Sequence, residues 1–355
     1  MRQSVMINNS FRKQSILPFV IALLISLPVS ANKELTILNW SEYMDPDLIK
    51  KFEATTNIKV RMTYYESDDI RDDMLINTNG KGYDIVVTNG PGIKKYYKKN
   101  WLEKINHKAM PNIKYIAEKW RTAFSQSKEY AVPYFWGTTG IAYRKDLVKK
   151  QVTSWLDFFK PEPGLEGKLS APKSSKDLIG MGLKALGYSA NSESKTELKK
   201  VEKLLREQKK YMKNYIYMTL DNNSPLITGE IVMTLAYSGD ALVLTELDEN
   251  IKYIVPKEGG NIWVDYMVVT KKSTNKDNAW KFLNFINEPK HAAQLANFVY
   301  YATPNKQAEK YLSKDFLQDK IIYPPENILN KSEYYRSIHG NAKRFRNIIF
   351  GSIVR

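Results

Sequence analysis

The sequence contains no cysteine, which excludes disulfide bonds, cysteine-ligated zinc, a cysteine nucleophile and a lipid-modified cysteine anchor. Histidine is almost as scarce, since only His107, His291 and His339 occur and they lie far apart. The HExxH zinc motif, the Walker phosphate loop, the GxSxG elbow and the GxGxxG dinucleotide turn are also missing. The sequence therefore favours a binding protein over an enzyme, and we expect no cofactor and no metal.

Long apolar runs are missing too, apart from Ile16 to Leu27 (ILPFVIALLISL). This run is too short for a comfortable membrane span. Basic residues precede it and small residues follow it, so residues 1–31 are predicted to be a cleaved secretory signal. The alternative, an uncleaved anchor, has no stop-transfer pattern to support it. We expect an exported protein that is free in a bacterial periplasm.

The formal net charge is +16, three charges of which fall within residues 1–31. Such an excess suggests a nucleic acid or an anionic membrane surface as one class of partner. However, the lysines are scattered along predicted helices, as in residues 202–211, and this spacing is typical of a solvated face. We therefore expect no nucleic-acid partner, although the arginine-richer segment 341–355 remains a candidate contact surface.

From Glu34 onward, strand-like and helix-like segments alternate, which predicts an α/β fold with mainly parallel sheets. Residues 215–220 (YIYMTL) are predicted to form one of the strands. Extended, glycine-containing segments near residues 137 and 260 are candidates for connections between two lobes. The boundaries that we expect are as follows: signal peptide 1–31, first lobe 32–137 plus 262–303, second lobe 138–261, and a C-terminal segment 304–355 packing on the second lobe.

Acids recur beside aromatic residues at the ends of predicted strands. The four places are Trp40-Ser41-Glu42-Tyr43, Tyr237-Ser238-Gly239-Asp240, Trp263-Val264-Asp265-Tyr266 and the pair Tyr300-Tyr301. Aromatic faces attract cations, and a carboxylate supplies the countercharge for an ammonium group taken out of water. The simpler alternative is that the rings fill the core and the acids cap helices. Because Trp263 and Asp265 are two residues apart on a strand, both side chains are expected on one face.

These motifs resemble the periplasmic polyamine-binding proteins of ABC importers, of the spermidine/putrescine type. The stretch NWSEY fits the family pattern N-W-[ST]-[ED]-Y. Other similar stretches, in the same order, are YDIVV, VPYFWGTTGIAY, VTSWLDFFKPE, LKALGYSAN, PKEGGNIWVDYMVV and TPN. The resemblance runs from about Leu35 to about Pro325 and weakens in the C-terminal tail. It implies a type II periplasmic-binding-protein fold: two α/β lobes joined by a hinge of extended segments, with the ligand cleft between them.

The resemblance also implies a set of ligand-binding residues. They are Trp40, Ser41, Glu42, Tyr43, Asn89, Asp177, Tyr237, Asp240, Trp263, Asp265 and Tyr301. The chain departs from the spermidine-type pattern in three places: Asn89 and Pro91 replace a serine and a tyrosine, Ser174 replaces an acid, and Tyr237 replaces a tryptophan. Glu42 is similar to the spermidine form, whereas Ser41 and Asp240 are similar to the putrescine form. The implied function is capture of a polyamine by a monomer and its delivery to an inner-membrane ABC permease.

Two alternative functions remain open on the sequence alone. The first is a ferric-iron-binding periplasmic protein that uses the tyrosine pairs Tyr64-Tyr65, Tyr300-Tyr301 or Tyr334-Tyr335. Such a site has no need of Trp40 or Trp263. The second is a basic protein that binds a surface or a nucleic acid.

Overall fold

The computed structural model describes residues 34–355, so the predicted signal peptide lies outside the described residues. Its strands are β1 (Glu34–Trp40), β2 (Lys59–Tyr65), β3 (Ile85–Asn89), β4 (Val132–Arg144), β5 (Leu169–Ser170), β6 (Met212–Asn214), β7 (Met233–Tyr237), β8 (Ile251–Ile254) and β9 (Asn261–Val269). None of the described helices is long and apolar enough to cross a membrane.

The α-helices follow the strands in most places where the sequence predicts them. They are α1 (Pro46–Thr56), α2 (Asp68–Asn77), α3 (Gly90–Lys98), α4 (Glu118–Arg121), α5 (Ser127–Tyr130), α6 (Trp155–Phe159), α7 (Ser175–Ala185), α8 (Lys195–Gln208), α9 (Ser238–Leu247), α10 (Lys276–Ile286), α11 (Pro289–Val299), α12 (Lys314–Gln318), α13 (Glu326–Leu329) and α14 (Gly340–Ile353). Short 3₁₀ turns are η1 (Pro111–Tyr115), η2 (Lys209–Tyr211) and η3 (Ala308–Tyr311).

Local sequence explains where the first helices begin. Asp45 caps α1 by accepting a hydrogen bond from the backbone N–H of Asp47, and Pro46 occupies the first turn, where its missing N–H costs nothing. Ser67 caps α2 in the same way. These caps fix the two loops that follow β1 and β2, which lie at the same edge of the sheet because β1 and β2 are parallel.

The strands form one sheet in the order β2-β1-β3-β9-β4-β7-β5-β6, with β8 paired to β4. Parallel pairs occupy its two sides, but β9 is antiparallel to β3 and β4, and β4 is antiparallel to β7 and β8. The prediction of mainly parallel pairing is therefore wrong at the centre. There the chain crosses from one group of strands to the other along β4 and returns along β9, so the two strands run in opposite directions.

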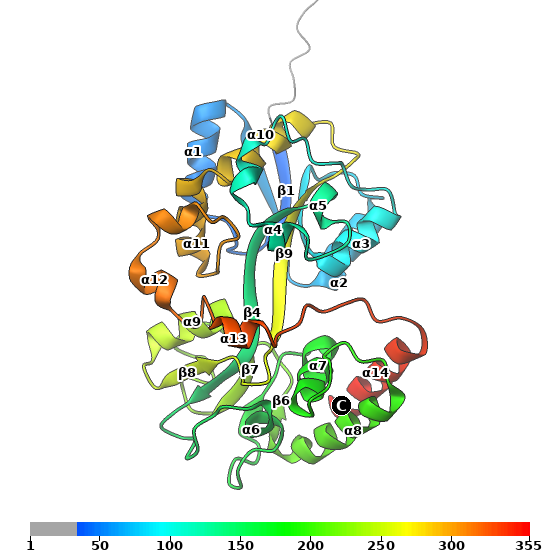
Figure 1. Cartoon of the computed structure of the whole chain (residues 1–355), viewed down its shortest axis with the longest axis vertical. Coiled ribbons are helices and arrows are strands. Elements are labelled where there is room, and N and C mark those ends of the chain that lie inside the picture. The colour runs from blue at the N-terminus through cyan, green and yellow to red at the C-terminus, as the bar shows by residue number, and fades with distance from the viewer. Residues whose placement is uncertain (1–33) are drawn as a thin grey trace, which may run out of the picture. The chain divides into compact units, whose positions relative to one another are not determined.

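The chain forms two lobes, and the long strands β4 and β9 run from one lobe to the other, in agreement with the fold class expected from the sequence (Figure 1). In the first lobe, buried residues of β1, β3, α1, α10 and α11 form one core, and α3 packs on the other face of the sheet. In the second lobe, α6, α7 and α8 pack on β7, and Ile349 and Ile353 of α14 belong to the same core. The segment 215–220, predicted as a strand, is irregular instead, and the strand in this region is β6.

Candidate ligand-binding site

The motif NWSEY begins at the end of β1. Trp40 is half-buried, and its ring lies 4.4 Å from that of Tyr65. Ser41 and Glu42 then form an exposed turn, in which Glu42 has a left-handed φ of 53°. The contacts described for residues 34–355 do not join Glu42 to the other predicted site residues, so its role stays a prediction. Tyr43 returns to the interior of the first lobe.

Three aromatic rings from distant parts of the chain meet beside β9. The rings of Trp263 and Tyr301 lie 4.7 Å apart at 88°, and those of Tyr43 and Tyr301 lie 5.8 Å apart at 73°. Edge-to-face packing of this kind holds each ring in a defined orientation. The structure thus brings together three of the predicted site residues.

Two glycines make room for these rings. A Cβ atom added at Gly137 of β4 would lie 2.3 Å from Cζ2 of Trp263, and one added at Gly239 of α9 would lie 2.3 Å from the ring of Tyr301. Any larger residue forces the ring to move. The glycines therefore determine where two aromatic walls of the candidate site lie.

Asp265 lies on β9, on the same face as Trp263, as the spacing of two predicts. The Tyr43 hydroxyl donates a hydrogen bond of 3.2 Å to its Oδ2 atom. Burial raises the pKa of Asp265 from 3.8 to about 7. The negative charge of Asp68 adds to this rise in pKa, whereas the Arg71 guanidinium opposes it.

Asp240, in the first turn of α9, is the second acid of the group. It accepts hydrogen bonds from the hydroxyls of Tyr301, at 3.3 Å, and Tyr217. Burial raises its pKa from 3.8 to about 6. Sequence reasoning missed Tyr217, because the residue lies in the segment that was expected to be a strand and nothing local indicates that an irregular segment carries its ring to Asp240.

Asp177, in the first turn of α7, is buried with 4% of its surface exposed. The hydroxyls of Tyr237 and Tyr335 donate to its two oxygens at 3.0 and 2.9 Å. Tyr335 is a second residue that sequence reasoning missed in this role, because the C-terminal tail resembles the family only weakly. Ser174, which replaces a family acid, serves as the N-cap of α7.

Asn89 ends β3 and caps α3, with its Oδ1 accepting from the Gly92 N–H at 3.0 Å. Its Nδ2 donates to Oδ2 of Asp68 at 2.7 Å. Asn89 lies directly opposite Asp265 in the antiparallel pairing of β3 and β9. Asp68 therefore lies at the border of the site, next to a predicted site residue.

The acids Asp177, Asp240 and Asp265 share one property. Each accepts hydrogen bonds from tyrosine hydroxyls, which are neutral, and none takes part in an ion pair within residues 34–355. Carboxylates that are removed from water in this way require a countercharge. Surrounded by aromatic rings, they form a site whose chemistry suits an organic cation.

The tyrosine pairs considered for ferric iron do not converge. Tyr64 is exposed, whereas the hydroxyl of its neighbour Tyr65 donates to the Val87 carbonyl at 2.9 Å. The hydroxyls of Tyr301 and Tyr335 are directed to different carboxylates.

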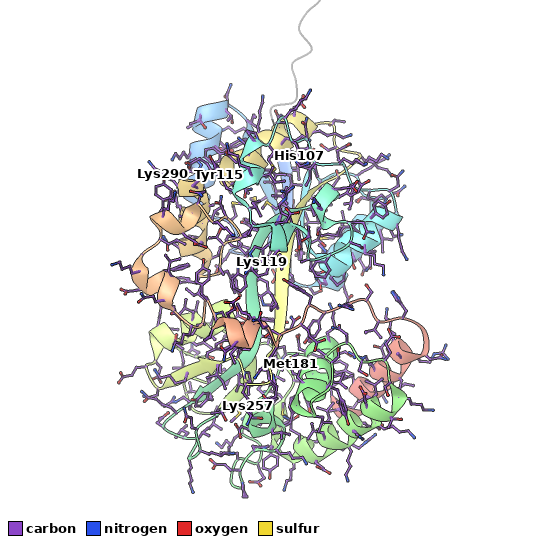
Figure 2. All side chains as sticks on the ribbon, in the orientation of Figure 1. His107, Tyr115, Lys119, Met181, Lys257 and Lys290 are labelled. Carbon is purple, nitrogen blue, oxygen red and sulfur yellow. The ribbon has the colours of Figure 1, made fainter. Side chains whose placement is uncertain are left out.

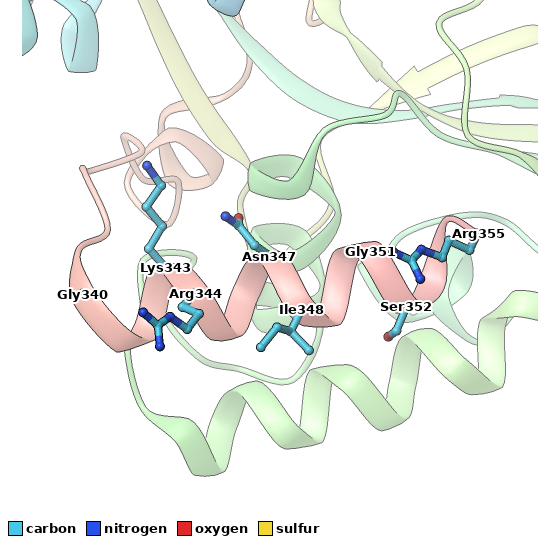
Figure 3. Close-up of a pocket in the computed structure, with 8 residues that line it drawn as sticks. All are labelled: Gly340, Lys343, Arg344, Asn347, Ile348, Gly351, Ser352 and Arg355. Carbon is cyan, nitrogen blue, oxygen red and sulfur yellow. The ribbon is translucent and has the colours of Figure 1, made fainter.

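Other features of the described residues do not resemble a cation site. No cluster of three or more histidine and acidic side chains suited to a metal occurs among them. His107, labelled in Figure 2, is exposed in the first lobe. Figure 3 shows a surface hollow along α14 that carries Lys343, Arg344 and Arg355, so its charge is unsuited to a cation.

Comparison with known proteins agrees with this chemistry. Residues 47–324 match the model of the bacterial extracellular solute-binding protein family. The spermidine/putrescine-binding periplasmic protein of Escherichia coli K12 is 33% identical over 310 residues, which cover 86% of this chain and 88% of that protein. The putrescine-binding periplasmic protein SpuD of Pseudomonas aeruginosa is 30% identical over 331 residues, which cover 88% and 89%.

Solved structures show the same fold. The spermidine/putrescine ABC transporter substrate-binding protein PotD of Streptococcus pneumoniae matches with a TM-score of 0.81 at 28% identity, over 90% of this chain and 98% of that one. A putative spermidine/putrescine ABC transporter protein of Listeria monocytogenes matches with a TM-score of 0.79 at 33% identity, over 90% and 98%.

Proposed function

Because the chain belongs to the bacterial extracellular solute-binding protein family, we propose that it captures a linear polyamine between its lobes and delivers it to an ABC importer. The main support is that Asp177, Asp240 and Asp265 accept hydrogen bonds only from neutral hydroxyls among the described residues. A polyamine supplies the missing charge at several points along one chain, and its methylene groups pack against the aromatic group that Trp263 and Tyr301 form.

The proposed binding mechanism involves no covalent chemistry. Asp265 belongs to the first lobe and Asp240 to the second, and a ligand that contacts both acids favours the form in which the lobes are closed. The hydrogen bond from Tyr301 to Asp240 already connects the two sides. Closure therefore depends on the contacts that the cation makes in the closed form and lacks in the open form.

The remaining parts of the proposal concern the setting in which the protein works. They are a periplasmic location after cleavage of residues 1–31, a monomeric state, an inner-membrane permease as partner, no catalysis, and the lobe boundaries predicted from the sequence. The names of the relatives support the location and the transporter partner.

A ligand screen tests the proposed function. Isothermal titration calorimetry is carried out with putrescine, spermidine and spermine, and with 1,4-butanediol as an uncharged control of the same length as putrescine. We expect at least one polyamine to bind with one molecule per chain and to raise the melting temperature, and the diol to do neither. The absence of both heat and a melting shift with all three polyamines would refute the proposal.

A further inference from the structure

One end of the candidate site contains cationic side chains of the protein itself. Lys176 of α7, in the second lobe, places its Nζ atom 3.4 Å from Oδ2 of Asp68 of α2, in the first lobe. Figure 1 shows these two helices on facing sides of the lobes. Lys176 directly precedes Asp177, so the lysine and one acid of the site are carried by the same helix turn.

Asp68 is held beside the site by two other groups. It accepts a hydrogen bond of 2.5 Å from Nη1 of Arg71 and one of 2.7 Å from Asn89, which lies opposite Asp265. The pKa of Asp68 is lowered, because Arg71, Lys176 and Asn89 together outweigh the effect of burial. Asp68 thus remains ionised next to the acid of β9.

The two carboxylates next to Asp265 are already paired with cations of the protein. Asp68 and Asp72 lie together with Arg71, Lys95 and Lys176. Arg71 is buried, with 2% of its side chain exposed, and is fixed by the Tyr96 hydroxyl at 2.7 Å. Lys95 is paired with Asp72. The side chain of Lys176 is 56% exposed, and its ammonium is the cation that reaches across from the other lobe.

We propose that Lys176 determines specificity by occupying the place on Asp68 that an additional ammonium of a longer polyamine would take, so that the chain prefers a diamine to a triamine. The proposal rests on the proposed polyamine-binding function and names the subclass of ligand. Asp177 and Asp240 have no cationic partner within residues 34–355, and together with Asp265 they suffice for a ligand with two ammonium groups. Because an ion pair this exposed contributes little to stability, its removal changes the ligand site without unfolding the protein.

The test measures putrescine and spermidine affinities by calorimetry for the full chain and three variants. In Lys176→Gln, Asp68 loses its partner from the second lobe and becomes free to bind a ligand ammonium in the closed site. We expect spermidine to bind on the order of tenfold more tightly, the factor that one charge-assisted hydrogen bond of about 1.4 kcal/mol provides. Putrescine affinity should change less than about threefold on the same scale. Lys176→Arg keeps the charge and should keep the preference for putrescine. Lys173→Gln removes the same charge from an exposed position three residues earlier and should behave like the unmodified chain.

Other results would contradict either the specificity role of Lys176 or the proposed function itself. If Lys176→Gln weakens both ligands equally, the ion pair merely holds the lobes together and the proposal is wrong. An unchanged ratio of the two affinities is equally incompatible with it. If the unmodified chain binds no polyamine at all, the proposed function falls first, and the specificity role falls with it.

Discussion

Two acids assigned to the site, Asp265 and Glu42, differ in their surroundings. Asp265 is half-buried and bonded to Tyr43, whereas Glu42 is exposed on a turn. We expect Asp265→Asn to weaken putrescine binding by about 30- to 5,000-fold, the range for removing one partner of a desolvated charge pair. Glu42→Gln should cost less than about threefold, since exposed charge pairs contribute little.

Calorimetry on both variants, with melting temperatures as the control for folding, checks this prediction. Equal and small losses of affinity would mean that Asp265 does not contact the ligand. If Asp265 only supports the strand end, Asp265→Asn lowers the melting temperature and leaves the affinity unchanged.

The raised pKa values of Asp240 and Asp265, about 6 and about 7 against an ordinary 3.8, predict a pH dependence. Between about pH 4 and pH 7 the folded protein retains protons that the unfolded chain has released, so these two acids reduce the stability of the ligand-free protein as the pH rises. A bound cation stabilises the ionised forms. Putrescine should therefore bind more tightly as the pH rises from 5 to 8, with release of protons.

The measurement is the putrescine-induced melting shift at each pH, combined with titrations in two buffers of different ionisation enthalpy to count the protons. Asp265→Asn is the control and should show a smaller pH dependence. A melting shift that stays constant from pH 5 to pH 8 would show that neither acid changes its protonation on binding.

At the scale of single residues, much of the candidate site was predictable. Tyr43, Trp263, Tyr301, Asp240 and Asp265 are brought together as a group by the fold. Tyr217 and Tyr335 were missed, because their contacts depend on the path of irregular segments. A hydrogen bond between residues far apart, such as that from Tyr335 to Asp177, has no periodic signature in the sequence.

Among the elements, the first turn of α9 offers a direct test of the aromatic wall. Gly239→Ala places a Cβ atom where the Tyr301 ring now lies. Because the ring must move away from both Trp263 and Asp240, we expect putrescine affinity to fall by about tenfold, the effect of roughly one lost aromatic contact. Calorimetry at pH 8 measures the change.

The matched control is Gly351→Ala in α14, where an added Cβ atom meets nothing within 4 Å. This substitution should leave affinity unchanged and stabilise the protein by about 0.5–1 kcal/mol, because alanine favours the helix. Unchanged affinity in Gly239→Ala would contradict the role of Tyr301 as a wall of the site.

The secondary-structure elements show what the sequence could and could not predict. Helices with a clear cap, such as α1 after Asp45, and strands with an apolar core, such as β1, were predicted correctly. The segment 215–220 has the composition of a strand, but β6 already occupies the neighbouring edge position at residues 212–214. The direction of β9 depends on pairing with β4, more than a hundred residues away, and sequence alternation carries no such information.

For the whole molecule, the formal net charge, which is +16 for the full chain and +13 without residues 1–31, opposes the approach of a cation. This long-range repulsion is screened beyond about 30 Å at 0.01 M salt and about 8 Å at 0.15 M. The acids of the site attract the cation over shorter distances than the net charge repels it, so salt weakens the repulsion more than the attraction. We therefore expect the association rate constant of putrescine to rise by about two- to fivefold between these salt concentrations, the reverse of ordinary electrostatic steering.

Stopped-flow fluorescence of the native tryptophans measures this rate. A variant with Lys199→Glu and Lys203→Glu, on the exposed face of α8, reduces the positive charge without touching the candidate site, and it should bind faster than the unmodified chain at low salt. The dissociation rate should be the same in both, because it depends on the contacts with Asp177, Asp240 and Asp265. If association slows as salt is added, the local acids govern the approach of the ligand and the net charge of the chain has no kinetic effect.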